Sequence, residues 1–297
     1  ADSSQIPTFL VSQLARRHVT VSLSGDGGDE LFGGYNRYFW GRSIWQAVGW
    51  MPIGLRHLLA NGINFTVPLI GDAVFRRMGA VIPTQQNTVD KLQKLARILA
   101  MGDQDSIYRN LLSHWKEPST VVSGAVEPMT LLTDRAQWAN LSDFTKRMMY
   151  LDTITYLPDD LLVKLDRASM AVSLEARLPL LDHRVVEFAW QVPISMKIRG
   201  RQGKWLLRQV LQRYVPHRLI DRPKMGFGIP IDSWLRGPLR DWAEDLLEER
   251  RLSKEGVFHA QPIREKWAEH LSGKRDWSYL LWDVLMFQGW WSAYGHP

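Results

Sequence analysis

Apolar and polar positions near the start of the chain change from one periodicity to another. Between residues 7 and 17 apolar side chains recur at helical spacing, which predicts a helix. Residues 19–23, Val-Thr-Val-Ser-Leu, are rich in β-branched side chains and predict a short strand. A glycine-rich loop follows, and a second helix is predicted from about Asp29. This order is typical of one unit of an open α/β sheet, where ligands bind beyond the carboxyl ends of strands.

The rest of the chain is predicted to be mostly helical. Residues 36–140 show helical patterns broken by prolines, and we recognise no catalytic motif in them. Further helices are predicted from about Asp143, over 159–171 behind Pro158, over 183–191 behind a capping Asp182, over 202–214 and over 277–291. We therefore expect a predominantly α-helical chain with one or two short strands near the N-terminus.

Composition narrows the classes of function. Zero cysteines among 297 residues exclude disulfides, thiolate metal sites and a cysteine nucleophile on this chain. No apolar run reaches the roughly 18 residues of a membrane helix and no secretory signal is recognised, so we expect a cytoplasmic protein without membrane contacts. The net charge of +6 indicates either an anionic partner or, as the favoured interpretation, a basic excess spread over solvated faces. The 14 tryptophans are expected to anchor cores or interfaces.

The loop over residues 24–30, Ser-Gly-Asp-Gly-Gly-Asp-Glu, carries the clearest chemical signal. Its glycines leave backbone N–H groups uncovered, and the following helix adds the positive end of its dipole, so a phosphate could approach. The carboxylates of Asp26, Asp29 and Glu30 would repel a bare phosphate, which makes sense if a divalent cation lies between them. The simpler alternative is a tight turn with Asp29 capping a helix. Neither the Rossmann nor the Walker glycine pattern fits.

Two later segments carry charged side chains in suggestive places. Lys164 and Arg167 lie three apart on the helix behind Pro158, where they could meet a phosphate or carboxylate. On the spacing alone, a solvated salt-bridge face with Asp160 is the favoured interpretation. Glu175 and Arg177 follow and are typical of a surface pair.

A third segment is a loop that contains a lysine. Lys224 lies between Pro223 and Pro230 and precedes two glycines. A lysine on such a loop could close over a reaction centre and neutralise developing negative charge, although an exposed loop lysine is common.

The glycine loop, the segment behind Pro158 and the lysine loop together resemble the glutamine-dependent asparagine synthetases. The similarity is carried by Leu-Ser-Gly-Asp-Gly-Gly-Asp-Glu-Leu-Phe-Gly-Gly-Tyr at 23–35, by the run from Pro158 to Arg184, and by Arg-Pro-Lys-Met-Gly-Phe-Gly-Ile-Pro at 222–230. The resemblance implies an α/β fold with a parallel nucleotide-binding sheet. Residues 1–35 would then belong to that sheet, and residues 36–297 to the mostly helical remainder of the synthetase domain.

The resemblance also implies a reaction and a set of roles. The reaction is the ATP- and Mg²⁺-dependent amidation of aspartate through β-aspartyl-AMP, with ammonia derived from glutamine. The resemblance implies that Ser24, Gly25, Gly27 and Gly28 bind the nucleotide and that Asp29 binds Mg²⁺. Asp26 would accept a proton, and Lys224 would stabilise charge at the reacting centre. Tyr35, Asp166 and Arg167 would line the substrate pocket, and Glu175 and Arg177 would support the site.

The sequence also departs from the family pattern. Asp26 stands where well-studied members carry a glutamate, and neither their Ser-Gly-Gly-x-Asp-Ser pyrophosphate loop nor their glutaminase domain is recognised here. We therefore expect half of the site and little activity from the isolated chain. A homodimer is a further expectation.

Three alternatives to aspartate amidation stay open. A relative with the same chemistry could adenylate a different carboxylate, such as a sugar acid or a β-lactam precursor. A nucleic-acid-binding module is less favoured, because the basic residues are scattered through helices rather than gathered on one face. The third alternative is a non-catalytic interaction protein.

Overall fold

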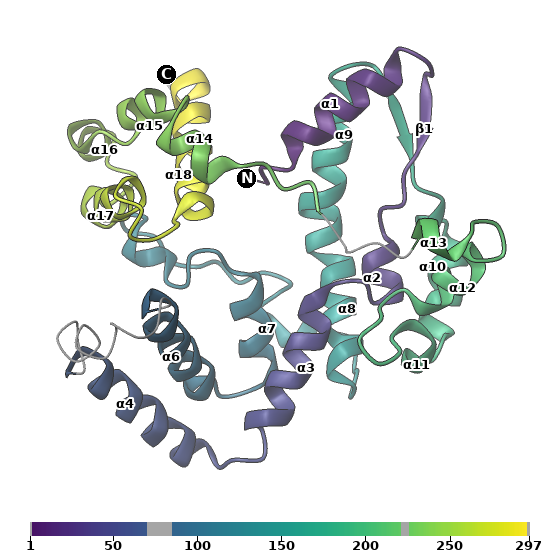
Figure 1. Ribbon diagram of the computed structural model, residues 1–297, viewed down its shortest axis with the longest axis horizontal. Helices are drawn as coiled ribbons and strands as arrows, with labels where there is room; N and C mark the ends of the chain where they lie inside the picture. Colours follow the sequence, from purple (N-terminus) through teal and green to yellow (C-terminus); the bar gives the residue numbers. More distant parts are fainter. Residues whose placement is uncertain (1, 70–84, 221–225, 296–297) are drawn as a thin grey trace.

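The computed structural model describes residues 2–69, 85–220 and 226–295, and most of these residues are helical, as expected (Figure 1). The helices and strands are α1 (Gln5–Arg16), β1 (Val21–Leu23), α2 (Gly28–Phe32), α3 (Asn36–Val48), α4 (Ile53–Leu69), α6 (Gln85–Ala100), α7 (Gln104–Leu112), α8 (Phe144–Ile154), α9 (Val163–Met170), β2 (Glu175–Arg177), α10 (His183–Gln191), α11 (Ile194–Lys197), α12 (Trp205–Leu211), α13 (His217–Ile220), α14 (Ile231–Arg236), α15 (Arg240–Leu246), α16 (Glu249–Glu255), α17 (Ala260–Leu271) and α18 (Ser278–Tyr294).

Strands β1 and β2 form the only sheet in the described part of the chain, and they run parallel. Val21 is opposite Glu175, and Leu23 is opposite Arg177. The strand predicted over residues 19–23 is therefore confirmed in a shorter form. Its partner, β2, lies far along the sequence rather than near the N-terminus. The sequence did not predict β2, because Glu-Ala-Arg has no local strand signal and becomes a strand only by pairing with β1.

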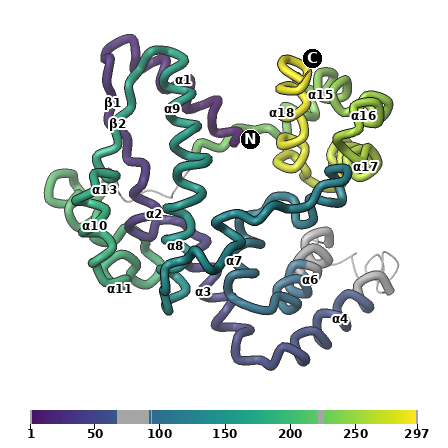
Figure 2. The backbone as a smooth tube through the Cα atoms, turned by 180° about the vertical axis from the view of Figure 1, so that it is seen from behind, coloured from purple at the N-terminus to yellow at the C-terminus, as the bar shows by residue number. Residues whose placement is uncertain are grey.

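Helices α1 and α9 lie side by side in both ribbon and tube views (Figures 1 and 2). Lys164 Nζ on α9 donates to Asp2 Oδ2 at 2.6 Å and to Ser4 Oγ at 2.9 Å. Burial opposes ionisation of Asp2, but hydrogen bonds from Lys164 and Ser4 keep its pKa below the usual value. Lys164 therefore forms its salt bridge with Asp2 and not with Asp160, and this pair connects α9 to the N-terminal segment.

Local signals predicted some helix boundaries and missed others. Asp182 caps α10 as expected, since its Oδ1 accepts from the Arg184 N–H at 3.0 Å. The helix behind Pro158 begins instead as a π-helical turn, η3 (Leu157–Leu162), which continues into α9. The helix predicted over 202–214 is shorter, because Lys204 has a left-handed φ of 55° and α12 begins only after it.

Four hydrophobic clusters hold the helices together in the described part of the chain, and two of them are the largest. One lies between α3, α7 and α8 and includes Tyr38, Tyr108 and Met148, all buried. The other is built by α14 to α18 around Trp267 and Leu285. These C-terminal helices form a separate cluster beside the N-terminus, on the opposite side of the molecule from β1 (Figure 2). Within the described residues, no helix combines the length and apolar character needed to cross a membrane.

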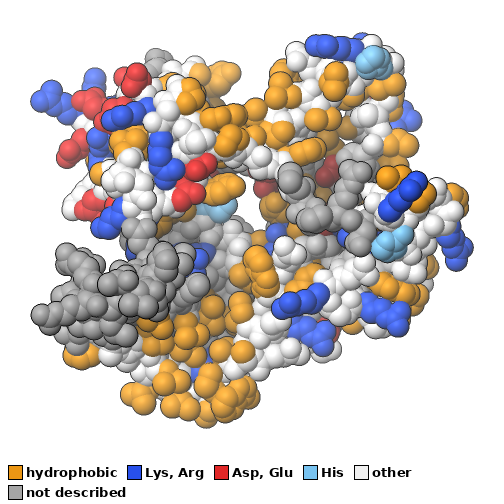
Figure 3. Space-filling view, in the orientation of Figure 1, with side chains coloured by type: hydrophobic (Ala, Val, Ile, Leu, Met, Phe, Trp, Pro, Cys, Tyr) orange, Lys and Arg blue, Asp and Glu red, His pale blue; other side chains and the backbone are white. Residues whose placement is uncertain are grey.

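The unit formed by α1 and β1 leaves apolar side chains uncovered. Leu10 and Leu14 on α1 are 56% and 58% exposed, and Leu23 on β1 is 74% exposed. Hydrophobic side chains are correspondingly visible over this region in the space-filling view (Figure 3). The sheet thus has a bare apolar face as well as unpaired strand edges in the described part of the chain.

Helix α8 provides a test of local stabilisation. Asp143 Oδ1 accepts from the Lys146 N–H at 2.8 Å and caps the helix. We expect Asp143→Ala to lower the free energy of unfolding by about 1 kcal/mol, measured by urea denaturation. Asp241→Ala is the control, because Asp241 is exposed in the first turn of α15 and does not cap it. An equal loss in both variants would contradict the capping role.

Candidate active site

The glycine loop lies between the end of β1 and the start of α2. Gly27 has φ +86°, and a Cβ there would come within 2.3 Å of Leu181 Cδ2. A Cβ on Gly28 would come within 2.9 Å of Leu180 Cδ1. The left-handed φ favours glycine at residue 27, and a Cβ at either position would push against a leucine of the neighbouring turn at Pro179–Leu181. Gly25 differs, because a Cβ there would meet nothing within 4 Å, so this side of the loop is open to a ligand.

Strand β2 fastens the loop through its main chain. The Ser24 N–H donates to the carbonyl oxygen of Arg177 at 2.8 Å, while Ser24 Oγ donates to Asp26 Oδ2. The side chains of Glu175 and Arg177 form an exposed ion pair at 2.7 Å. The support that these two residues provide in the structure comes from their backbone, whereas their side chains form the surface pair that the spacing indicated.

Asp29 in the first turn of α2 forms an ion pair with a residue that the sequence analysis did not assign. Lys204 Nζ lies 2.9 Å from Asp29 Oδ2, with both side chains partly buried. The N-terminal end of α2 adds partial positive charge on the same side. An ammonium, a carboxylate and a helix N-terminus therefore meet at one point beside the glycine loop.

Close backbone approach makes this ion pair possible. A Cβ on Gly34 would come within 1.8 Å of Asp29 Oδ1 and 2.4 Å of Lys204 Cε. A Cβ on Gly203 would come within 2.3 Å of the Gly33 carbonyl oxygen. The Lys204 N–H also donates to the carbonyl oxygen of Phe32 at 3.0 Å. Gly34 and Gly203 are the sequence signal that would have pointed to Lys204. Gly203 lacks a side chain where two backbone segments touch, and Gly34 lacks one where the Asp29 and Lys204 side chains lie.

Tyr35, predicted to line a substrate pocket, has its hydroxyl engaged inside the protein. It donates to Glu30 Oε1 at 2.5 Å. Glu30 is 1% exposed, and its Oε2 has no hydrogen-bond partner in the described part of the chain. Burial raises the pKa of Glu30, although the hydrogen bond from Tyr35 works in the opposite direction. Tyr35 therefore links the end of α2 to a buried polar network.

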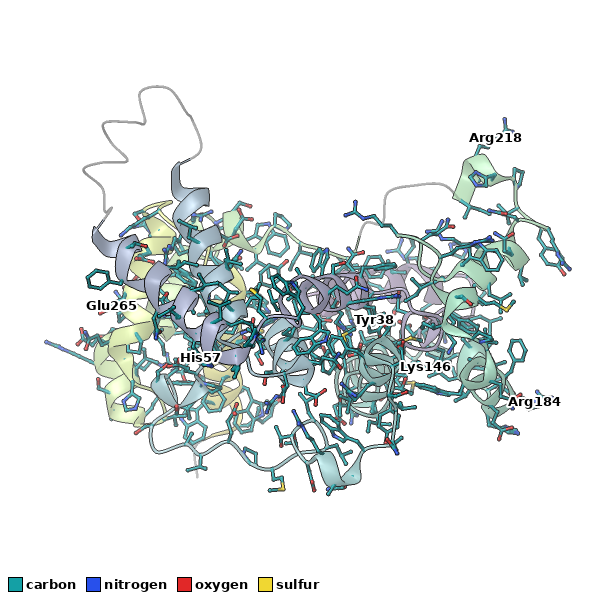
Figure 4. All side chains as sticks on the ribbon, turned by 90° about the horizontal axis from the view of Figure 1, so that it is seen from below. Tyr38, His57, Lys146, Arg184, Arg218 and Glu265 are labelled. Atoms are coloured by element: carbon teal, nitrogen blue, oxygen red, sulfur yellow. The ribbon has the colours of Figure 1, made fainter. Side chains whose placement is uncertain are left out.

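Asp152 on α8 is the centre of that network and is fully buried. Its Oδ2 accepts from Arg37 Nε at 2.9 Å and from the Tyr38 hydroxyl at 2.6 Å, and its Oδ1 accepts from the Tyr108 hydroxyl at 2.6 Å. Tyr38 lies in the middle of the molecule (Figure 4). Burial raises the pKa of Asp152, and the Arg37 charge and these hydrogen bonds oppose the rise.

Arg37 connects the network to both sides of the site. Its guanidinium lies 3.9 Å from the ring centroid of Tyr35 and 4.7 Å from that of Tyr156, close enough for cation–π attraction to both rings. Tyr35 follows the glycine-loop helix α2, and Tyr156 immediately precedes the π-helical turn that leads into α9. The glycine loop and α9 are thus positioned by one shared cation.

Among the described residues, Asp166 and Arg167 have no hydrogen bond or ion pair with the glycine loop. Asp166 and Arg167 are exposed on α9. Lys224 lies outside the described residues. Ser24 and Asp26 do meet at the loop, and Asp29 lies one turn further on.

The donor set is compatible with Mg²⁺ bound together with phosphates. No group of three or more histidine or acidic side chains suited to a metal occurs among the described residues. Mg²⁺ is commonly held by one or two carboxylates together with substrate phosphates, so Asp29 fits as one such ligand. The ammonium of Lys204 beside it would suit a phosphate oxygen equally well.

Comparison with known proteins assigns the family. The model of the asparagine synthase family matches residues 1–292. The chain is 31% identical over 292 residues to asparagine synthetase (glutamine-hydrolyzing) 1 of Bacillus subtilis strain 168, covering 98% of this chain and 43% of that protein. It is also 31% identical over 293 residues to a putative asparagine synthetase (glutamine-hydrolyzing) of Mycobacterium tuberculosis strain H37Rv, covering 98% and 42%. A weaker similarity, 22% over 262 residues, covers 83% of this chain and 38% of amidase chyE of Penicillium rubens.

The chain therefore belongs to the asparagine synthase family. It spans less than half the length of the curated relatives that match it best along its sequence. No solved structure gives a significant match.

The contact between Gly34 and Asp29 predicts a strong effect of one added methyl group. Gly34→Ala should lower the free energy of unfolding by about 1–3 kcal/mol, because a Cβ cannot fit between Asp29 and Lys204. Gly54→Ala is the matched control: a Cβ on this glycine of α4 meets open space, and alanine favours the helix. If urea denaturation gives the same value for Gly34→Ala and the unaltered protein, the backbone contact is not as described.

The buried ion pair predicts strong coupling between Arg37 and Asp152. Asp152→Asn alone should cost about 3–5 kcal/mol, because it leaves a largely buried guanidinium without its counter-charge. The double variant Arg37→Met/Asp152→Asn should be less destabilised than the sum of the single changes, since no uncompensated charge remains. The more exposed pair Arg251–Asp245, changed in the same way, should show coupling of only about 0.2–1 kcal/mol. Additive effects at Arg37 and Asp152 would contradict this account.

Proposed function

We propose that this chain provides the amide-forming side of an ATP-dependent synthetase that converts aspartate to asparagine with ammonia from glutamine. The side-chain carboxylate of aspartate attacks the α-phosphorus of ATP, and pyrophosphate leaves with the electrons of the broken P–O bond. Ammonia then attacks the acyl carbon of β-aspartyl-AMP, AMP leaves, and the nitrogen loses a proton to a base. The names of the relatives support this reaction, because they are glutamine-hydrolyzing asparagine synthetases.

The observation that carries the proposal is the grouping at the end of β1. An open glycine position at Gly25, the acid Asp26 and the Asp29–Lys204 ion pair lie on one loop and its adjoining turn. The open backbone at Gly25 and the nearby ammonium of Lys204 support phosphate recognition at this loop. Amide formation requires a proton acceptor beside them, for which Asp26 is suitably placed.

In this proposal the site residues divide the work between the two chemical steps. Ser24, Gly25, Gly27 and Gly28 bind the nucleotide, and Asp29 binds Mg²⁺, which would neutralise the phosphates when bound. Asp26 accepts the proton during amide formation, and Lys224 stabilises charge at the reacting centre. Tyr35, Asp166 and Arg167 line or brace the acceptor pocket. Lys204 adds a cation on the pyrophosphate side of Asp29.

The domain arrangement is part of the same proposal. The parallel pair β1–β2, with its exposed Leu23 and unpaired edges, has the form of the margin of a larger nucleotide-binding sheet. Residues 1–35 would belong to that sheet together with β2, and residues 36–297 would supply most of the helical surroundings.

A second candidate is amidation of a different carboxylate by the same adenylation chemistry. Asp26 supports it, because this side chain is one methylene shorter than the glutamate expected in well-studied family members and so changes the reach of the acid. The similarity to a protein named as an amidase also fits a wider range of reactions. Comparing aspartate with a panel of other acids in one pyrophosphate-release assay distinguishes the two candidates.

The proposal predicts that Asp29 is required for adenylation. In the longest chain that the gene encodes, Asp29→Asn should lower pyrophosphate release with ATP, Mg²⁺, aspartate and ammonium by at least about 100-fold, which corresponds to about 2.7 kcal/mol of transition-state stabilisation. Lys224→Ala should cause a loss of similar size. The control is Lys254→Ala on the exposed side of α16, which should be without effect.

Two results would count against the proposal. Unchanged pyrophosphate release in Asp29→Asn would remove the metal-binding role of Asp29. The 297-residue chain alone should release little pyrophosphate, because the Ser-Gly-Gly-x-Asp-Ser loop is absent from its sequence. Robust turnover by that chain, lost in Lys224→Ala, would show that it carries a complete site.

A further inference from the structure

A large cavity of about 1210 Å³ lies away from the glycine loop. Its walls come from α6, the end of α7 with the loop behind it, and the turn between α17 and α18. These segments lie where the C-terminal helices face α6 and α7 in both views of the backbone (Figures 1 and 2). None of the residues 24–30 lines the cavity.

The lining of this cavity is strongly basic. Seven lysine and arginine side chains line it, against two carboxylates, those of Glu117 and Asp276. Lys116 Nζ donates to the carbonyl oxygens of Asn110 and Ser113, the latter at 2.6 Å, which fixes the ammonium without cancelling its charge. Burial and the nearby charge of Arg97 lower the pKa of Lys116, so two cations converge on this wall. An anion bound beside the Lys116 ammonium would offset this unfavourable charge.

Aromatic rings form a second wall. Lys266 Nζ lies 5.1 Å from the ring centroid of Trp115 and 5.2 Å from that of Trp277. Trp277 Nε1 donates to Glu269 Oε2 at 2.7 Å, which holds the indole in place. Arg275 lies 5.7 Å from the same ring centroid. These distances place cations over the indole faces, so positive charge and planar apolar surface lie together on this wall, as they do where the phosphates and the base of a nucleotide are bound.

We propose that this cavity binds a nucleoside polyphosphate, at a site separate from the glycine loop and independent of the function proposed for that loop. Its volume exceeds what a single phosphate fills and suits a nucleotide-sized ligand. The phosphates contact Lys116 on the basic wall and Lys266 on the aromatic wall, and the base packs against Trp115 beside Lys266. The chain has a net charge of +6, and basic side chains are concentrated around this cavity rather than spread evenly over the molecule.

The test uses the 297-residue chain and two probes, ATP and inorganic tripolyphosphate, titrated calorimetrically without Mg²⁺ at low ionic strength. Lys116→Gln should weaken binding of both probes by roughly tenfold, and Lys116→Gln/Lys266→Gln by roughly 100-fold, since each lost charged hydrogen bond costs about 1.4 kcal/mol or more. Trp115→Leu should weaken ATP by roughly fivefold or more and leave tripolyphosphate within about twofold, because only ATP carries a base.

Two control variants separate this cavity from other basic or nucleotide-binding surfaces. Lys254→Gln/Arg240→Gln removes two exposed cations outside the cavity and should leave both affinities unchanged. Asp29→Asn alters the glycine loop and should likewise leave Mg²⁺-free tripolyphosphate binding within about twofold. This result is independent of whether Asp29 proves necessary for pyrophosphate release.

Three outcomes would overturn the proposal. Unchanged affinity in Lys116→Gln/Lys266→Gln would show that the anion binds elsewhere. A change of tenfold or more in Asp29→Asn would place it at the glycine loop. Equal loss of ATP and tripolyphosphate in Trp115→Leu would remove the base-stacking wall and leave a site for phosphate chains alone. Circular dichroism of each variant confirms that a lost affinity is not lost folding.

Discussion

The structure depends on one fully buried carboxylate, Asp152, and on the cation beside it. A charge in this position is tolerated only because Arg37 and two tyrosine hydroxyls donate to it. Arg37 in turn lies between the rings of Tyr35 and Tyr156. The helix that follows the glycine loop and the π-helical turn that starts α9 therefore share one anchor. Replacement of this polar centre by apolar side chains would keep the volume but lose the fixed angle between those two elements.

A second constraint is steric and acts where the chain touches itself. Gly34 and Gly203 let the segment that carries Lys204 lie directly against the end of α2, which places the Lys204 ammonium on Asp29. The glycines of the loop itself, Gly27 and Gly28, serve the packing of leucines from a neighbouring turn. The fold therefore constrains both of these positions, and of Gly25, Gly27 and Gly28 only Gly25 would leave space for a Cβ.

The sequence predicted the features that depend on neighbouring residues. The first helix, the strand behind it and the cap at Asp182 follow from periodicity, β-branching and capping chemistry, which act within a few residues. The partner strand β2, the Lys164–Asp2 bridge and the role of Lys204 were missed, because each depends on residues that the fold brings together from distant positions. The candidate loop was recognised from its pattern, while the positions of Asp166 and Arg167 on an exposed face required the structure.

The narrow sheet has a practical consequence for the molecule in solution. In the part of the chain that the structure describes, this short parallel pair has open strand edges, and the exposed Leu23 adds apolar surface beside them. Another chain that approaches this margin can continue the ladder and bury the leucines of α1 at the same time. A charged residue in place of Leu10 or Leu14 would put polar atoms into this exposed apolar surface and make such a contact less favourable.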